Sequence, residues 1–435
     1  MDLFRTALKL KGFPIDKAEK TFNEISSLPE AEFEQYINSS KQAIVDYHLE
    51  NNPLYKTIAR GKAAEDWQDL PIVTKAELQK PLEQRITPGF ENKVHSGKTS
   101  GSSGVPMFYI KDKFAHAMTW ANILNEYAQH GVEYGSSYQA RFYGIALDPI
   151  GYRRERFKDF LSSRYRFSVY DLSDKVLSTY VDVFTKRKFT YIYGYTSSIV
   201  LFAKYLITNK IKLSGLCPTL KCCITTSEML SDEDRVILNK ALGIPIVNEY
   251  GASEVGLLAF TGTDGKMYID TRNLFVEVLD DDGNCVPDGT SGRIVVTSLY
   301  NKAQPIIRYE VGDRGTLLPG SSPKFKILKS LEGRTNDIAH LPSGKKVPGM
   351  TIYNLTKSVI DYSANVKEFV VVQTAPDKFE VRYTAHNKLT VEEESVIVDG
   401  FNKYLEPGLT INIVKQEAID RAASGKLKQF TTMVK

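Results

Sequence analysis

The segment from His95 to Met107 has the composition of a loop that binds an anion. Three glycines and four hydroxyl residues fall between Gly97 and Gly104. Helix and strand interiors disfavour such a stretch, because glycine loses the most backbone freedom and serine competes for backbone hydrogen bonds. A bend whose amides and hydroxyls surround phosphate oxygens suits it better. A flexible glycine–serine linker is the alternative. It is not a Walker loop, since Asn92 stands where that motif needs glycine.

Three other polar segments, at 194–197, 225–228 and 249–254, each follow an apolar run of strand type. In a parallel sheet, ligands bind beyond the carboxyl ends of the strands, so these segments are expected at one edge. The last segment ends in Glu254.

The elements that would position these segments alternate between strands and helices from about 138 to 255. Short connections between such elements favour an α/β layer with a largely parallel sheet. We expect strands at 139–146, 189–193, 220–224 and 244–248, and helices at 175–184, 197–208 and 231–242.

The flanking regions differ in character. Residues 1–90 are predicted to be a helical lead-in, with capping boxes at Ser27/Glu30 and Thr74/Glu77, and another helix is expected over 111–131. The fold class is therefore α/β, with a large N-terminal domain over 1–335 and a small mobile α+β domain over 336–435. Within a β-rich part at about 266–330 we expect strands at 267–269, 274–279, 293–299 and 305–309. Beyond it we expect helices at 351–362 and 390–405, and strands at 367–373, 378–384 and 409–414.

Composition excludes several classes of protein. A chain of 435 residues with 42% hydrophobic and 25% charged residues is globular, and a net charge of +4 does not indicate a nucleic-acid partner. Four cysteines lack metal-site spacing and fit a reducing compartment. We find neither an apolar signal core nor a run long enough to span a bilayer, so a cytoplasmic location is expected.

Taken in order, the motifs resemble those of the adenylate-forming ligases, the acyl-CoA synthetase superfamily. The resemblance is greatest to the phenylacetate–CoA ligase branch, including relatives encoded with capsule and surface-polysaccharide genes. It covers about residue 50 to Lys426. The motifs are Thr99-Ser-Gly-Ser-Ser-Gly-Val-Pro106, Thr226-Ser-Glu228, Glu249-Tyr-Gly-Ala-Ser-Glu254, Arg308-Tyr-Glu-Val-Gly-Asp313, Gly333-Arg-Thr-Asn-Asp337 and Ser424-Gly-Lys426.

The resemblance implies an ATP site with Mg²⁺ on Glu254, where one carboxylate is chemically sufficient because the ion also binds phosphate oxygens. The alternative for Glu254 is a solvated carboxylate at a helix start. Tyr250 would lie against adenine, Asp313 would accept the ribose hydroxyls, and Lys426 would bridge the substrate carboxylate and the α-phosphate. A pivot between the domains falls at Asn336. The implied nucleotide-binding residues are Thr99, Ser100, Gly101, Ser102, Ser103, Gly104, Ser227, Glu228, Glu249, Tyr250, Gly251, Ala252, Ser253, Asp313 and Arg334.

This chain departs from the family pattern at three positions. Val105 stands where many members have lysine, which removes a cationic contact with pyrophosphate. Ser227 replaces a small glycine or alanine, and Asn336 replaces an aspartate at the pivot.

The same resemblance implies that the chain activates a carboxylic acid as an acyl-adenylate with ATP and Mg²⁺ and transfers the acyl group, with CoA as the favoured acceptor. Its substrate pocket would lie at Tyr143, Gly144, Tyr193 and Tyr195, whose aromatic rings favour an aryl or medium-sized acid. Two alternatives stay open: transfer to an amine or hydroxyl of a surface-polysaccharide precursor, and an inactive nucleotide-binding scaffold. The resemblance also allows for a homodimer.

Overall fold

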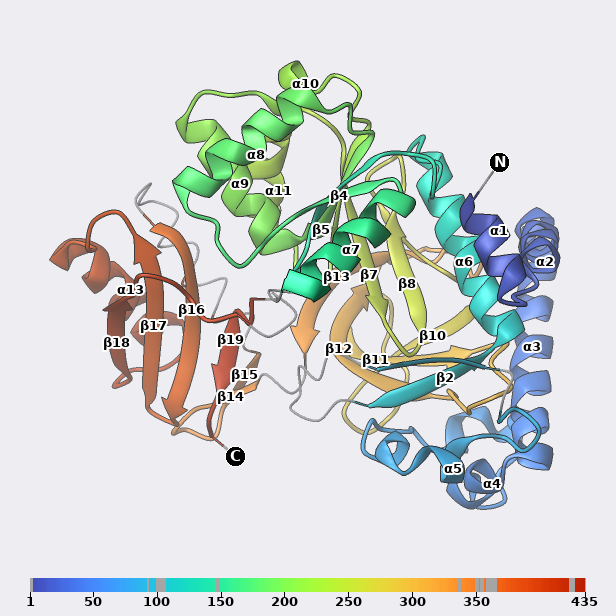
Figure 1. Ribbon diagram of the computed structural model, residues 1–435. Coiled ribbons are helices and arrows are strands. Elements are labelled where there is room, and N and C mark those ends of the chain that lie inside the picture. The colour runs from blue at the N-terminus through green and yellow to red at the C-terminus, as the bar shows by residue number, and fades with distance from the viewer. Residues whose placement is uncertain are drawn as a thin grey trace.

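The structure is a computed structural model that describes residues 3–91, 94–98, 107–145, 149–334, 338–348, 352, 356, 366–421 and 427–434. Helices at the N-terminal end pack beside a mixed α/β body, and the C-terminal strands form a separate sheet on the other side of that body (Figure 1). The described helices are α1 (Leu3–Leu10), α2 (Ile15–Ser27), α3 (Glu30–Asn51), α4 (Pro53–Ala59), α5 (Leu82–Arg85), α6 (Lys113–Gln129), α7 (Pro149–Leu161), α8 (Asp174–Lys186), α9 (Thr196–Thr208), α10 (Leu213–Leu216), α11 (Asp232–Leu242) and α13 (Val391–Tyr404), with short 3₁₀ helices at Ala64–Asp69 and Glu77–Gln79.

The strands of the α/β body form one large sheet and two smaller ones. They are β1 (Val94–Lys98), β2 (Phe108–Asp112), β3 (Gln139–Phe142), β4 (Arg164–Phe167), β5 (Tyr191–Tyr195), β6 (Cys222–Thr226), β7 (Ile246–Ala252), β8 (Gly256–Thr261), β9 (Met267–Ile269), β10 (Leu274–Leu279), β11 (Ser291–Ser298), β12 (Tyr309–Leu317) and β13 (Leu328–Arg334).

The large sheet has the strand order β4-β3-β5-β6-β7-β8-β9. Its first five strands are parallel, and β8 and β9 extend it antiparallel. The predicted parallel α/β layer is therefore confirmed. Buried aromatic rings from the strands and from α8 and α9, such as Phe142, Phe184 and Phe202, fill one face. Tyr127 of α6 packs on the other face, with Tyr191 of β5.

The β-rich region forms an antiparallel sheet of order β10-β11-β12-β13. The strand predicted at 305–309 is wrong, because β12 begins only at Tyr309. Arg308 has a φ of 45°, outside the range of a strand. Its buried guanidinium lies 3.3 Å from Glu277 and donates to the carbonyls of residues 67, 68 and 70. This buried pair holds the β-rich sheet against the helical lead-in.

The two predicted capping boxes do not start α-helices. Ser27 ends α2, and its hydroxyl donates to the carbonyl of Asn23 at 2.8 Å, while α3 begins after Pro29. Pro29 disfavours the helical region for the preceding Leu28, whose ψ is 137°, so the helix begins two residues later than predicted. At the second box, Glu77 accepts from the Thr74 amide at 2.7 Å, but only a 3₁₀ turn follows.

The C-terminal part forms its own sheet, of order β18-β17-β16-β19. The helix α13 packs on this sheet and begins with a complete capping box of Thr390 and Glu393. The helix predicted at 351–362 lies almost entirely outside the described residues. Lys367 of β16 pairs with Asp174 of α8 at 2.9 Å across to the larger body. The strands of this region are β14 (Ile338–His340), β15 (Lys346–Pro348), β16 (Val366–Ala375), β17 (Lys378–Ala385), β18 (Thr410–Lys415) and β19 (Phe430–Thr432).

A search of the helices in the described ranges finds none that is both long and apolar enough to cross a membrane.

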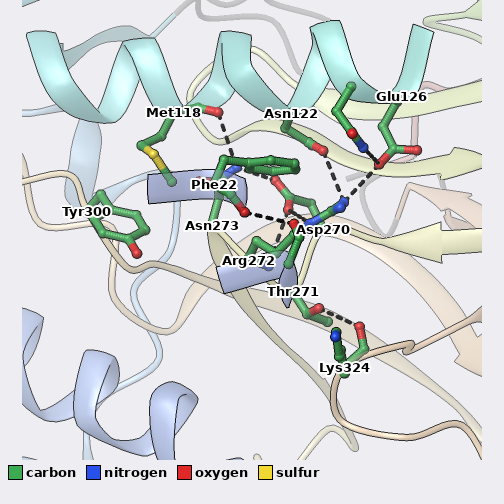
Figure 2. A network of polar contacts seen from close by, with 12 residues as sticks. Phe22, Met118, Asn122, Glu126, Asp270, Thr271, Arg272, Asn273, Tyr300 and Lys324 are labelled. Atoms are coloured by element: carbon green, nitrogen blue, oxygen red, sulfur yellow. Dashed lines mark hydrogen bonds and ion pairs between the residues drawn. The ribbon is translucent and has the colours of Figure 1, made fainter. Parts of the chain in front are cut away.

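A polar network centred on Arg272 joins the N-terminal helices to the body (Figure 2). The Arg272 guanidinium donates to Glu126 at 2.8 Å and to Asn122 at 3.2 Å, both on α6. It also lies 3.4 Å from Asp270 and over the ring of Phe22 on α2. Because Glu126 and Asp270 are both buried, this one cation compensates two carboxylates that water does not solvate.

We expect Arg272→Ala to lower the free energy of unfolding by about 2–4 kcal/mol, because it leaves buried carboxylates without their cation. Denaturant unfolding followed by circular dichroism would measure the change. The matched control is Arg154→Ala, which truncates an exposed arginine on α7 and should change stability by less than about 0.5 kcal/mol. Equal effects of the two substitutions would contradict the role given to this network.

Candidate active site

Tyr250 and Asp313, which the resemblance assigns to adenine and ribose, are in contact. The Tyr250 hydroxyl donates a hydrogen bond to Asp313 Oδ2 at 2.7 Å. Tyr250 belongs to β7 and Asp313 to β12, so the contact joins the large sheet to the β-rich sheet. Arg334 is the backbone partner of Asp313 on the neighbouring β13. Tertiary structure therefore brings three predicted nucleotide residues from three motifs together, although their roles remain predictions.

Glu254 lies in the tight connection between β7 and β8. The chain approaches itself closely here: a Cβ on Gly251 would fall 2.6 Å from the carbonyl oxygen of Gly256. The side chain of Glu254 is 7% exposed, and its Oε1 accepts a hydrogen bond from the Tyr309 hydroxyl at 2.8 Å. The tyrosine of the Arg308–Asp313 motif therefore orients the carboxylate that is predicted to bind Mg²⁺.

A buried lysine supports the same connection. Lys111 lies in β2, the strand that follows the glycine-rich segment, and its Nζ donates to the carbonyl of Val255 at 2.8 Å. Burial lowers the pKa of Lys111 to about 8, and the neighbouring Glu254 opposes that shift. The chain thus places a cation beside Glu254 although the glycine loop itself has Val105 in place of lysine.

We expect Lys111→Met to lower kcat/KM for ATP about 10- to 100-fold, because a hydrogen bond from a charged donor to the Glu254–Val255 backbone is lost. Pyrophosphate release at varied ATP concentration would measure it. Lys266→Met, in the exposed turn between β8 and β9, is the matched control and should stay within about two-fold, as surface substitutions usually do. If both variants use ATP equally well, Lys111 does not position Glu254.

Glu228 connects the end of β6 to the C-terminal part of the chain. Its Oε2 accepts from the Ser197 amide at 2.7 Å, and its Oε1 accepts from the Leu427 amide at 2.8 Å. Burial raises the pKa of Glu228, and these two amides counteract the shift. Arg421 donates to Ser197 Oγ at 3.3 Å and pairs with Glu368 of β16. Leu427 directly follows the predicted catalytic lysine in the sequence.

The predicted substrate-pocket residues gather at the carboxyl ends of β3 and β5. The rings of Tyr143 and Tyr193 are stacked with centroids 5.8 Å apart, and those of Tyr143 and Tyr195 lie 4.1 Å apart. The Tyr143 hydroxyl lies 3.4 Å from Ser227 Oγ, and Ser227 has a left-handed φ of 69°. The Gly144 carbonyl accepts from Arg166 at 2.9 Å. These residues therefore form one cluster, as expected, and their contact with a substrate remains a prediction.

Glu249 joins this cluster by its side chain. Successive side chains of a strand point to opposite faces, and Glu249 points away from Tyr250. Its carboxylate accepts from Tyr127 at 2.8 Å, from Tyr193 at 3.0 Å and from Thr226 at 2.9 Å. Burial raises the pKa of Glu249, and the three hydroxyls oppose that shift. The nucleotide-binding role predicted for Glu249 is untested, but its described contacts are with the tyrosine cluster.

Several predicted residues have no described side chain. Arg334 ends β13, but only its backbone is described. Ser253 is exposed and Ala252 is half-buried beside Glu254. The remaining predicted residues, which lie outside the described ranges, are Thr99, Ser100, Gly101, Ser102, Ser103, Gly104, Asn336 and Lys426.

Sequence reasoning missed three polar residues that the structure brings into this region, namely Lys111, Arg141 and Tyr127. Lys111 had a signal, because it directly follows the short apolar run Met107–Ile110 after the glycine loop. Arg141 and Tyr127 had none, since they act on Glu249 and Tyr193 across long separations in the chain.

The residues present suit a Mg²⁺ ion held chiefly by its nucleotide. No group of three or more His, Cys, Asp or Glu side chains in the described ranges is arranged to hold a metal. Glu254 offers a single buried carboxylate, with Oε1 fixed by Tyr309. Mg²⁺ is commonly bound by one or two carboxylates together with phosphate oxygens and water.

The chain has the fold of the adenylate-forming acyl-CoA ligases. A 2-hydroxyisobutyryl-CoA ligase solved in the postadenylation state with R3-HIB-AMP superposes with a TM-score of 0.71, at 18% identity, over 93% of this chain and 90% of that one. An open conformation of that ligase, in complex with 2-HIB-AMP and CoA, gives 0.58, at 18% identity, over 93% of this chain and 92% of that one.

In sequence, the chain is related to protein CapK and to phenylacetate-coenzyme A ligase. It is 26% identical to CapK of Staphylococcus aureus over 328 residues, which are 72% of this chain and 69% of CapK. It is 30% identical to the ligase of Pseudomonas putida over 141 residues, but that match spans only 30% of this chain and 32% of the ligase. No family model matches the chain.

Proposed function

We propose that this chain activates a carboxylic acid with ATP as an acyl-adenylate, releases pyrophosphate, and transfers the acyl group to the thiol of CoA. The observation that carries the proposal is the convergence of Tyr250, Asp313 and Glu254 where β7 meets the β-rich sheet. Relatives named phenylacetate-coenzyme A ligase and a structural neighbour named as an acyl-CoA ligase support it.

In the first step, a carboxylate oxygen of the acid bonds to the α-phosphorus while the bond to pyrophosphate breaks. The carboxylate is already ionised near neutral pH, so this step needs no general base. The enzyme must align the two reactants and neutralise charge. Asp313 would hold the ribose, and Tyr250 would hold the base. Mg²⁺ on Glu254 would supply positive charge at the phosphates, and Lys426 would supply it at the reacting oxygens.

In the second step, the CoA thiol releases its proton to solvent, its sulfur bonds to the acyl carbon, and AMP leaves with the bonding electrons. Lys426 must then withdraw, for which the C-terminal part (336–435) would turn about Asn336 relative to 1–335. The Glu228–Leu427 hydrogen bond is a contact that such a rotation would break.

A panel of carboxylic acids in a pyrophosphate-release assay, with and without CoA, tests the proposal. Acid-dependent release would support adenylation and would exclude an inactive scaffold. The mass of the product would distinguish an acyl-CoA from a product formed on an amine or hydroxyl of a surface-polysaccharide precursor. Absence of release with every acid would contradict the proposed function.

We also propose a cytoplasmic location. The four cysteines are free, and three of them are buried, which suits a reducing compartment.

A further inference from the structure

Glu249 is a charged residue at the predicted substrate pocket that the proposed chemistry does not use. It lies near the carboxyl end of β7, beside the ends of β5 and β6, where ligands of parallel sheets bind. Its side chain is half-buried, among the tyrosines of the pocket. Burying a carboxylate in such surroundings costs free energy unless hydrogen bonds satisfy its oxygens. The donors to the Glu249 carboxylate therefore decide whether it can accept a group of the substrate.

The hydrogen bonds around Glu249 leave one acceptor position open. Its Oε1 accepts two hydrogen bonds, from Tyr193 and Thr226. Its Oε2 accepts one, from Tyr127. A carboxylate has about four lone-pair positions in all. Among the described residues, Oε2 can therefore accept one further donor.

Arg141 supplies a positive charge close to the Glu249 carboxylate. Its guanidinium lies 4.3 Å from the Tyr143 ring centroid and 5.1 Å from that of Tyr193. It contacts Gln139 at 3.4 Å, its buried Nε has no hydrogen-bond partner, and it forms no ion pair with a described residue. One cation and one carboxylate therefore flank the same tyrosine. Because their charges offset each other, the pair favours a neutral donor over an ammonium group.

We propose that the acid activated by this chain carries a hydroxyl group, and that this hydroxyl donates a hydrogen bond to Glu249 Oε2. The inference rests on the proposed function, because it concerns the acid that enters the same site. The stacked rings of Tyr143 and Tyr193 form an aromatic wall beside this acceptor. The acid is thus a hydroxylated one of aryl or medium size, rather than a purely apolar acid.

Matched pairs of acids test this substrate class. The probes are 4-hydroxyphenylacetate with phenylacetate, 3-hydroxybutyrate with butyrate, and 3-aminobutyrate as the ammonium analogue, assayed by pyrophosphate release. In each pair that reacts, the hydroxylated acid should have a kcat/KM about 10- to 100-fold higher, as expected for a hydrogen bond to a charged acceptor. Equal or better use of the plain acid, or preference for the amine, would overturn the inference while leaving the proposed function intact. If no acid reacts, the proposed function fails, and this inference fails with it.

The substitution Glu249→Gln should reduce the hydroxyl preference to about three-fold or less, because a neutral amide is a weaker acceptor than a carboxylate. The ratio of kcat/KM values within a pair does not depend on the fraction of folded enzyme. Thr226→Val is the matched control: it removes a donor to Oε1, leaves the open position on Oε2, and should preserve the ratio. An unchanged ratio in Glu249→Gln would overturn the proposal. An unchanged ratio together with a raised KM for ATP would assign Glu249 to the nucleotide instead.

Discussion

Lys426→Ala is expected to abolish ATP–pyrophosphate exchange, with a loss of about 10²- to 10³-fold or more, while transfer from preformed acyl-adenylate stays largely intact. In the first step, negative charge accumulates on the carboxylate and the α-phosphate, and a positioned cation there stabilises the transition state. In the second step AMP departs and that cation is no longer needed. Exchange of labelled pyrophosphate into ATP, measured beside thioester formation from synthetic acyl-adenylate, would separate the two steps.

Lys428→Ala is the matched control for this prediction. Lys428 is exposed, carries the same charge and lies only two residues further along the chain. It should retain exchange within about two-fold, as surface substitutions usually do. Exchange that survives at a near wild-type rate in Lys426→Ala would show that the reacting oxygens are neutralised by another group. A parallel loss in both steps would instead indicate damage to the fold.

Glu254→Gln should lower the use of MgATP by about 10²- to 10³-fold, the second-largest effect we expect. The substitution removes the negative charge that would bind the metal, and Mg²⁺ prefers charged oxygen ligands. It keeps a carbonyl oxygen at this position, so the hydrogen bond from Tyr309 is retained and the connection from β7 to β8 should still form. The fold is therefore expected to survive the loss of activity.

A titration of pyrophosphate release against Mg²⁺ concentration is the decisive measurement for Glu254. The variant should require a much higher metal concentration than the wild type. Glu310→Gln, on β12, is the control, because Glu310 pairs with Arg293 at 2.9 Å and has no role in the proposed site. An unchanged metal dependence in Glu254→Gln would remove Glu254 from the metal site.

Much of the fold could be predicted from local patterns. Alternating apolar runs and capped helices from 138 to 255 indicated a parallel α/β layer, and the structure has one. The strand predicted at 305–309 failed because a buried ion pair with Glu277 accompanies an unusual backbone angle at Arg308. The helix predicted to start at Ser27 failed because Pro29 fixed a later start. In both cases an interaction or a constraint outweighed the local pattern.

The candidate site, too, could be predicted only in part from the sequence. The resemblance of the motifs, taken in order, to those of the adenylate-forming ligases brought Tyr250, Glu254 and Asp313 into one hypothesis. No local pattern connects Lys111 with Val255, or Tyr309 with Glu254, since these pairs lie far apart in the chain. Such pairs become neighbours only when sheets and turns pack together.

The sequence by itself determined the class of fold, the order of the motifs and the types of residue that are predicted to bind ATP. What only the tertiary structure decided is which way each side chain points. Glu249 and Tyr250 are adjacent, yet the alternation of a strand directs one toward the tyrosine cluster and the other toward Asp313. Side-chain direction depends on strand register and on partners from distant segments, and these are fixed only when the chain has folded.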